Sequence, residues 1–423
     1  MLLTSSGAGL ALWLLLRRLG RGRPELSLAW PVATAFLVRV AAAIAVPLTG
    51  AERTLRGGDE VVFVDLARGM SGQSLASADN VDAFTSSMHQ WLFALHFRFL
   101  DDAPDLALRI TQVGIAVAGL LLMATAVYEL AGPRAGQVVM WVLALEPSNV
   151  FFSSILHKEP LMLLAEGLVL FGGARLWVRD DFGALFPMAF GAALAVATRP
   201  YVGWFLMAAV VFIALHASIN RPSDLRSLAL IGVVGVLIAA FVPTVWNASS
   251  ETELAKLQVS QEANTSERDE ANLKLERVDY STRGDVVLNL PRRIRDVVFR
   301  PYPWQVDNLS QRLGMIGTLV VLGALGLLMV TVIQNAGTVM QRAGPFVYVT
   351  LFLLAAYALS SGNSGTAFRY RTHIAAVGFC LLLALRERAS ARRAPGPLPP
   401  EAGSRRQDMP RHATAPAEIR PTT

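Results

Sequence analysis

Two adjacent carboxylates, Asp59 and Glu60, follow a pair of glycines directly after the first long apolar stretch of the chain. They belong to a segment that reads Arg56-Gly57-Gly58-Asp59-Glu60 and continues through Phe63, Asp65, Ala67 and Arg68 to Gly69-Met70. Ionisable groups near the hydrocarbon layer are expensive, and those that persist there usually serve a function. A carboxylate in this position suits proton transfer to or from a reacting group. We therefore expect Asp59 or Glu60 to be the acid/base of an enzyme that works at the outer membrane face.

The composition is that of an integral membrane protein. Of the 423 residues, 53% are hydrophobic and 17% are charged, and the mean hydropathy is +0.44. The apolar residues fall into blocks of roughly 15 to 22, close to the roughly 20 that a helix needs to cross the hydrocarbon layer. The single cysteine, Cys380, lies in an apolar block, which excludes a disulfide framework and a thiolate metal site. The net charge of +6 arises from arginines in short loops and the tail. The orientation of the chain in the membrane explains this distribution better than a nucleic-acid partner does.

We predict an all-α bundle in the cell membrane with about ten transmembrane helices, or about eleven if the N-terminal apolar block also crosses. The predicted spans are 29–49, 110–131, 135–152, 160–174, 184–198, 201–217, 227–245, 313–333, 345–360 and 373–385. Residues 1–23 would form an N-terminal anchor with a basic loop, 24–389 the transmembrane domain, and 390–423 a disordered cytoplasmic tail. Because basic residues favour cytoplasmic loops, the two long loops, 50–109 and 246–312, are expected outside.

Each long outer loop is expected to contain a helix that lies in the membrane interface. In the first loop this helix would be centred on Trp91, with polar and apolar residues interleaved. In the second loop Leu290 and Ile294 recur at helical spacing beside Arg292 and Arg293, as expected of a helix on anionic head groups.

The predicted orientation sends the unusual polar clusters to one side of the membrane. These clusters are Asp59-Glu60, His157-Lys158-Glu159, Arg199-Pro200-Tyr201, Arg300-Pro301-Tyr302-Pro303-Trp304 and Arg369-Tyr370-Arg371. Carboxylates on one wall and basic residues on another suit transfer from a phosphate-linked donor. The carboxylate would accept a proton from the acceptor hydroxyl, and the basic side chains would hold the phosphate. If the donor is a lipid-linked sugar, the spans would hold its lipid tail.

The segment Gly58-Asp59-Glu60, followed by Phe63 and Ala67, resembles the start of the GT-C membrane glycosyltransferases, which include protein O-mannosyltransferases and lipid A aminoarabinose transferases. The similarity continues in Met88-His89-Gln90-Trp91, in Leu108-Arg109, and in Pro147 with Ser153 and Lys158-Glu159. The clusters at 300–304 and 369–371 resemble segments of bacterial members that are linked to exopolysaccharide synthesis. The resemblance covers residues 29–386. It implies inverting transfer from a polyprenyl-phosphate sugar to an extracytoplasmic glycan, lipid or protein, with the first-loop acid as base. Many members have Tyr where this chain has Phe63, so a hydroxyl contact of some relatives is absent.

On this hypothesis Asp59 and Glu60 are catalytic, and the substrate-binding residues are His157, Lys158, Glu159, Arg199, Arg300, Tyr302, Trp304, Arg369, Tyr370 and Arg371. The acid pair and a donor phosphate would also accept a divalent cation, but the sequence offers no second fixed ligand set, so no cofactor is assigned. The chain contains no Cys/His metal spacing, no Walker loop and no nucleophile elbow.

Simpler roles remain open for the same residues. The acid pair would cap a helix, and Lys158-Glu159 would be a surface ion pair. Arg369 and Arg371 would anchor the last span, Arg199 would pair with Glu146, Tyr302 and Trp304 would be interface anchors, and Arg39 in the first predicted span has no assigned partner.

Two other functions also remain open. A polysaccharide polymerase or ligase would use the same arginines beside a lipid-pyrophosphate donor without needing the first-loop acid. A flippase or transporter of lipid-linked sugars would bury its polar groups near the midplane between repeated halves, and the sequence shows no internal repeat.

Overall fold

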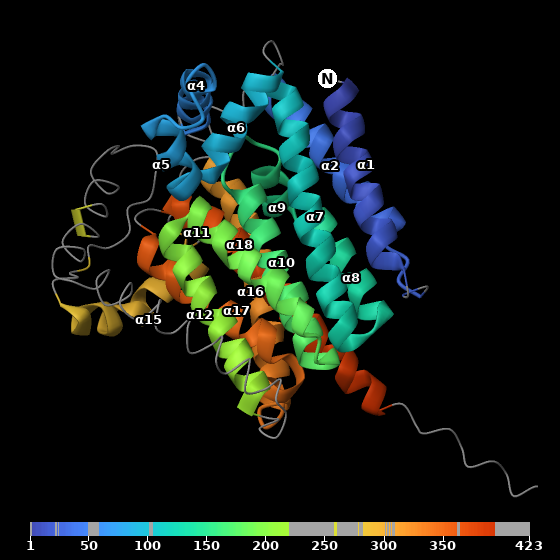
Figure 1. The fold of residues 1–423 in the computed structure, drawn as a ribbon. Coiled ribbons are helices and arrows are strands. Elements are labelled where there is room, and N and C mark those ends of the chain that lie inside the picture. Colours follow the sequence, from blue (N-terminus) through green and yellow to red (C-terminus); the bar gives the residue numbers. More distant parts are fainter. Residues whose placement is uncertain are drawn as a thin grey trace, which may run out of the picture.

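The computed structural model describes residues 2–21, 23, 25–49, 59–100, 105–219, 258–259, 278, 282–300, 302, 304, 306, 309–361 and 364–393. Within these residues the chain forms 15 α-helices and one short 3-10 helix, with no strand (Figure 1). The predicted all-α fold of a polytopic membrane protein is therefore confirmed. The predicted span 227–245, most of the first half of the second outer loop and the tail beyond residue 393 lie outside the described residues.

Seven of the described helices are long and apolar enough to cross a membrane. They are α2 (Ala29–Leu48), α7 (Asp105–Ala131), α10 (Glu159–Arg179), α12 (Pro200–Ile219), α16 (Leu309–Gln334), α17 (Val339–Ser360) and α18 (Ser364–Arg393). Each of them coincides with a predicted span. Two further predicted crossings fall on shorter helices, one on η1 (Phe182–Ala184) with α11 (Leu185–Thr198), the other on α8 (Pro133–Leu145) with α9 (Pro147–Ser153).

Helix α10 lies at the centre of the bundle, and its main neighbours are α7 and α11. Glycines bring α7 and α10 into backbone contact. A Cβ atom placed on Gly119 of α7 would lie 2.5 Å from the carbonyl of Leu163, and one on Gly167 of α10 would overlap the carbonyl oxygen of Gly119. Small residues allow such close approach between membrane helices. The contact fixes the position of Glu159, with which α10 begins.

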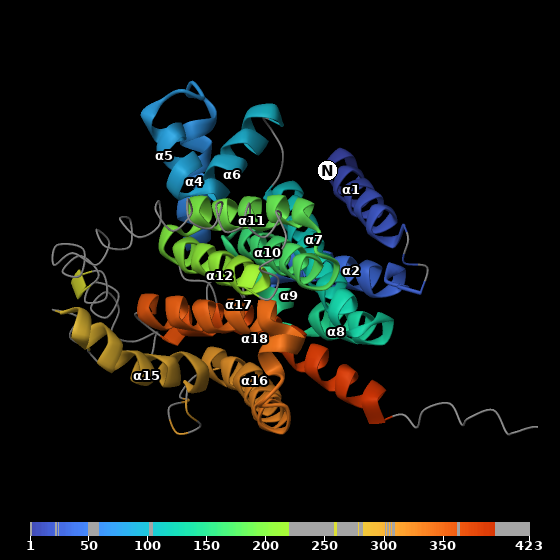
Figure 2. The ribbon, with the colours of Figure 1, turned by 60° about the horizontal axis from the view of Figure 1, so that its bottom comes forward.

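The remaining helices surround this centre in layers. Helix α1 (Leu2–Gly20), the predicted N-terminal anchor, packs along α7. Helices α15 (Arg283–Phe299) and α16 lie on the side of α17 and α18 that faces away from α10 (Figure 2). Helices α4 (Asp59–Ser71), α5 (Ala78–Ser86) and α6 (Met88–Phe99) form a separate cap at one end of the bundle. A helix was predicted around Trp91 and another around Leu290, and the structure forms α6 and α15 there.

A buried arginine closes a break in the third predicted span. The helix ends at Leu145 and restarts at Pro147, and Arg39 from the middle of α2 reaches the break. Its guanidinium donates to the carbonyls of Leu143 and Ala144, at 2.9 and 3.0 Å, and to Oδ1 of Asn149 at 2.7 Å. Backbone groups inside a membrane need partners within the protein, because no water is available there. Arg39, for which the sequence suggests no partner, therefore donates hydrogen bonds to the carbonyls at the end of α8.

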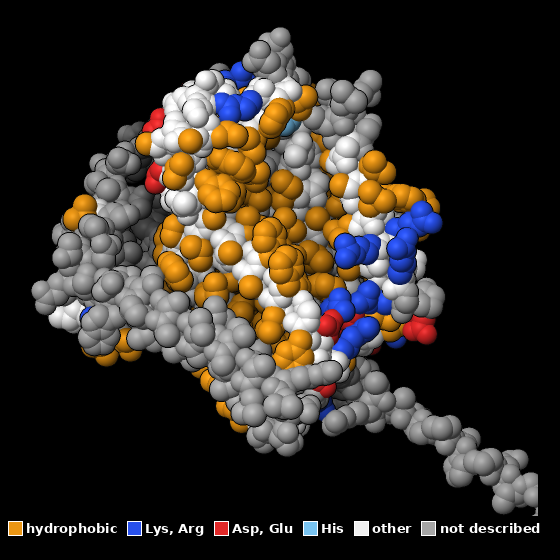
Figure 3. All heavy atoms as spheres, viewed as in Figure 1, with side chains coloured by type: hydrophobic (Ala, Val, Ile, Leu, Met, Phe, Trp, Pro, Cys, Tyr) orange, Lys and Arg blue, Asp and Glu red, His pale blue; other side chains and the backbone are white. Residues whose placement is uncertain are grey.

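The two ends of the bundle carry different side chains. At one end the carboxylate of Glu129 in α7 pairs with Arg23 after α1 and, at 2.7 Å, with Arg179 of α10. Figure 3 shows Lys and Arg side chains gathered at this end, beyond a broad apolar belt. At the opposite end α10 and α12 begin, and the cap of α4, α5 and α6 lies beside them (Figure 1).

Candidate functional site

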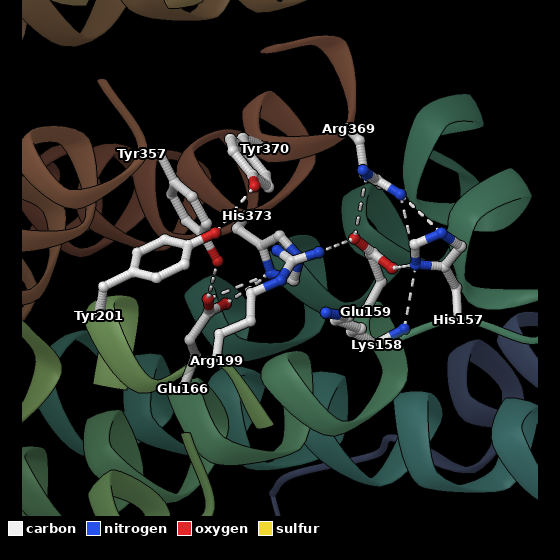
Figure 4. A network of polar contacts seen from close by, with 10 residues as sticks. All are labelled: His157, Lys158, Glu159, Glu166, Arg199, Tyr201, Tyr357, Arg369, Tyr370 and His373. Atoms are coloured by element: carbon white, nitrogen blue, oxygen red, sulfur yellow. Dashed lines mark hydrogen bonds and ion pairs between the residues drawn. The ribbon is translucent and has the colours of Figure 1, made fainter. Parts of the chain in front are cut away.

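A buried polar network lies where α10 and α12 begin (Figure 4). At its centre the side chain of Glu159 is completely buried. Its Oε1 accepts from Nη2 of Arg199 at 2.5 Å and lies 3.6 Å from Nε of Arg369, while Oε2 lies 2.6 Å from Nδ1 of His157. An isolated buried carboxylate would cost several kcal/mol, and these basic neighbours supply the compensation. Four of the predicted substrate-binding residues thus meet in one cluster.

The ring of His157 lies between Arg369 and Glu159. Nη1 of Arg369 lies 2.5 Å from Nε2 of His157, and the backbone N–H of Lys158 donates to Nδ1 at 3.1 Å. Nδ1 also faces Oε2 of Glu159. His157 therefore contacts Arg369 and Glu159 through its two ring nitrogens.

Three separate segments supply these side chains. Glu159 is the first residue of α10 and is followed by Pro160, a residue well suited to a first helical turn. Arg199 forms the corner between α11 and α12, where its backbone (φ −144°, ψ 87°) is non-helical, as favoured for the residue before Pro200. Arg369 lies in the second turn of α18. The predicted last span, 373–385, starts too late, because α18 already begins at Ser364.

The cap reaches this network through Phe63 of α4. The centroid of the Phe63 ring lies 5.2 Å from that of His157, and Nζ of Lys158 lies 5.6 Å from the same ring. His157 and Lys158 therefore contact the helix that starts at Asp59. The side chain of Asp59 lies outside the described residues. Glu60 is buried and forms an ion pair with Arg109 of α7 at 2.7 Å.

Aromatic rings line the inner side of the network. The guanidinium carbon of Arg199 lies 4.8 Å from the ring centroid of Tyr370. The hydroxyl of Tyr370 lies 3.1 Å from that of Tyr201, and its ring stacks on Tyr357 with 4.6 Å between centroids. Tyr370 is therefore part of the cluster.

A second buried carboxylate lies deeper along α10. Glu166 is completely buried, and its carboxylate lies 3.1 Å from Nδ1 of His373 and 3.4 Å from the hydroxyl of Tyr357. Glu159 and Glu166 are seven residues apart and so share one face of α10. Sequence reasoning missed Glu166, His373 and Tyr357. The signal was present, because Glu166 and His373 are ionisable residues within predicted spans.

Four predicted substrate-binding residues lie around the C-terminal end of α15. Nε of Arg371 donates to the carbonyl of Val297 at 3.0 Å, and its Nη atoms donate to the Thr318 hydroxyl and the Arg300 carbonyl. Tyr302 and Trp304 stack with 4.9 Å between ring centroids, and the guanidinium carbon of Arg300 lies 5.7 Å from the Tyr302 ring. Arg371 thus connects α18 to α15, in contrast to its neighbour Arg369.

The basic side chains of the described cluster differ in their exposure. Lys158 and Arg369 are partly exposed, whereas Arg199 is buried against Glu159. Among the residues that the structure describes, no group of three or more His, Cys, Asp or Glu side chains is arranged to hold a metal ion. A divalent cation bound through Asp59 would involve a side chain outside the described residues.

Comparison with protein-family models, with curated proteins and with solved structures finds no match to this chain.

Proposed function

We propose that this protein is a membrane glycosyltransferase that moves a sugar from a polyprenyl-phosphate donor to an extracytoplasmic glycan, lipid or protein acceptor. The observation that carries the proposal is the meeting of Lys158, Arg199 and Arg369 beside the helix that starts at Asp59. Basic side chains at the mouth of an apolar bundle match a phosphate whose lipid tail lies in the membrane.

The proposed orientation places this mouth outside the cell. The opposite end carries Arg23, Arg134 and Arg179, and an excess of basic residues marks the cytoplasmic side. The C-terminal tail, which follows α18, would then be cytoplasmic. The spans and the bilayer would hold the polyprenyl chain, while the acceptor approaches from the aqueous side.

In the proposed reaction Asp59 accepts the proton of the acceptor hydroxyl. The hydroxyl oxygen forms a bond to the anomeric carbon as the bond from that carbon to the phosphate oxygen breaks, which inverts the configuration. The electron pair leaves with the polyprenyl phosphate, and the partly exposed Lys158 and Arg369 stabilise its charge. The ion pair of Glu60 with Arg109 holds the start of α4 against α7. Arg199 holds Glu159 in place.

Transfer of labelled sugar by purified variants tests the acid/base role. Asp59→Asn is expected to reduce turnover by about 10² to 10⁴, the usual contribution of a positioned acid or base. Asp65→Asn is the matched control, because Asp65 is an exposed carboxylate on the same helix. Wild-type turnover in both Asp59→Asn and Glu60→Gln would show the assignment to be wrong.

A second candidate is a polysaccharide polymerase or ligase that uses a lipid-pyrophosphate donor. Its support is the basic character of the described cluster, in which Glu159 is held by Arg199, His157 and Arg369. The same variants separate the two candidates. Loss of transfer in Arg369→Ala, with unchanged transfer in Asp59→Asn and Glu60→Gln, would favour the polymerase.

A further inference from the structure

His89 differs from His157 and His373, the other described histidines that are completely or nearly completely buried. It lies in the first turn of α6 and is completely buried. The buried rings of His157 and His373 each contact a glutamate, at 2.6 and 3.1 Å. In contrast, neither ring nitrogen of His89 has a hydrogen-bond partner among the residues that the structure describes. Burying an unsatisfied polar group costs about 1 to 3 kcal/mol, so this ring lowers the stability of the ligand-free protein.

His89, with its unsatisfied ring, lies beside the candidate functional site. Its ring centroid lies 4.8 Å from that of Phe63, and the ring of Phe63 in turn lies 5.2 Å from that of His157. Nζ of Lys158 lies 5.6 Å from the same phenyl ring. His89 is therefore separated from the Glu159 network by the width of one aromatic ring, on the side formed by α4 and α6.

The environment of His89 keeps its ring uncharged. Burial lowers its pKa well below the ordinary value of 6.5, and the positive charges of Lys158, His157 and Arg199 lower that pKa further, against the opposing effect of Glu159. An uncharged imidazole offers one donor and one acceptor. A hydroxyl group also donates and accepts, so it can satisfy such a ring, whereas an ionised phosphate only accepts and is better matched to Lys158 and Arg369.

We propose that His89 is a specificity-determining residue that hydrogen-bonds a sugar hydroxyl of the lipid-phosphate donor. The inference rests on the proposed function and assigns phosphate binding and sugar recognition to different residues of that site. The basic residues hold the phosphate, and His89 recognises the polyol attached to it. The unsatisfied nitrogens of the ligand-free protein are the groups that the sugar satisfies.

The first test is the stability of the ligand-free protein. His89→Phe fills a similar volume among Phe63 and Phe93 and removes both nitrogens. Its temperature of unfolding in detergent is expected to exceed that of the wild type. His89→Gln keeps a donor and an acceptor and is expected to unfold close to the wild type. A lower temperature for His89→Phe would show that the ring has a structural partner, and would overturn the inference.

The second test compares two lipids, polyprenyl phosphate and polyprenyl-phosphate hexose, by thermal shift and by equilibrium binding. His89→Phe is expected to bind the hexose lipid about tenfold more weakly than the wild type, because one hydrogen bond is lost. Its affinity for the sugar-free lipid is expected to equal that of the wild type. His89→Gln is expected to retain most of the preference for the hexose lipid. An unchanged preference in His89→Phe would overturn the role of His89 alone. Failure of the wild type to bind either lipid would overturn the proposed function together with the sugar assignment.

Discussion

Glu159 and Arg199 form a buried ion pair, with 2.5 Å between Oε1 and Nη2, across 40 residues of sequence. The pair joins the start of α10 to the corner between α11 and α12. Its side chains are 0% and 3% exposed, so neither charge has access to bulk water. The same contact therefore holds three helices together and sets the electrostatics of the candidate site.

Removing Arg199 is expected to destabilise the fold. In Arg199→Met the carboxylate of Glu159 loses its closest basic partner, and the free energy of unfolding should fall by about 3 kcal/mol. The double variant Glu159→Gln/Arg199→Met should recover part of this loss, because it also removes the charge. Unfolding in detergent measures both effects. The control is Arg134→Met, whose side chain is 84% exposed and 3.9 Å from Glu387 and should contribute little. Equal stability of Arg199→Met and Arg134→Met would contradict a structural role for the buried pair.

Arg369 and Arg371 are expected to differ in what their loss affects. Arg371→Ala leaves the carbonyls of Val297 and Arg300 without their donor and should lower the free energy of unfolding by about 1 to 3 kcal/mol. Its transfer rate per folded molecule should stay near that of the wild type. Arg369→Ala should instead reduce transfer more than stability. Unfolding curves and turnover, both measured on monodisperse protein, check the contrast, and an equal loss of transfer in both variants would refute it.

Backbone contact between α7 and α10 predicts a strong effect of a side chain at Gly167. Gly167→Val would force the two helices apart and should cost about 1 to 3 kcal/mol. Gly323→Val on α16 is the matched control, because a Cβ atom there meets nothing within 4 Å. Thermal unfolding of the two variants compares the sites. Similar unfolding temperatures would mean that the helices are not in contact at Gly167.

The lowered pKa of His89 predicts a loss of stability in acid. The unfolded chain takes up a proton at His89 near pH 6.5, whereas the folded protein does so only at much lower pH. Because the unfolded state then binds more protons, the free energy of unfolding falls as the pH decreases below about 6.5. His89→Phe removes this contribution. Between about pH 7 and pH 5 its unfolding temperature should therefore decrease less than that of the wild type, and parallel curves would exclude His89 as a source of the acid sensitivity.

Sequence reasoning located most membrane helices because long apolar runs have few alternatives to a helix. It did not locate the break at Glu146, which lies inside an apolar run. The carboxylate of Glu146 accepts from the backbone N–H groups of Ser148 and Asn149, so it caps α9, and Pro147 fits the first turn of the new helix. Whether the helix breaks at such a sequence or continues through it depends on Arg39. This residue belongs to another helix, α2, and donates to the carbonyls that the break leaves without helical partners.

The candidate site was predicted in part for a related reason. Arg369 and Arg371 both lie before residue 373, where the last predicted span starts, and both were predicted as site residues. Residues two apart on a helix face different directions, so only one of them could reach Glu159 once α18 began at Ser364. The direction depends on where the helix starts, which composition does not define. Glu166 was missed because the predicted site residues all lie outside the predicted spans. Glu166 lies within the span 160–174, on the helix face that it shares with Glu159.

Arg39 also has a consequence for the biogenesis of the protein. Its carbonyl acceptor on Leu143 lies 104 residues further along the chain, so α2 is synthesised well before the groups that Arg39 needs. Until then an arginine occupies the middle of a membrane helix, which costs about 2.5 to 3.5 kcal/mol on insertion scales. A chain that ends before α8 should insert α2 less efficiently than the same chain with Arg39→Leu, and adding α8 and α9 should abolish the difference. The arginine thereby makes stable insertion of an early helix conditional on the arrival of a later one.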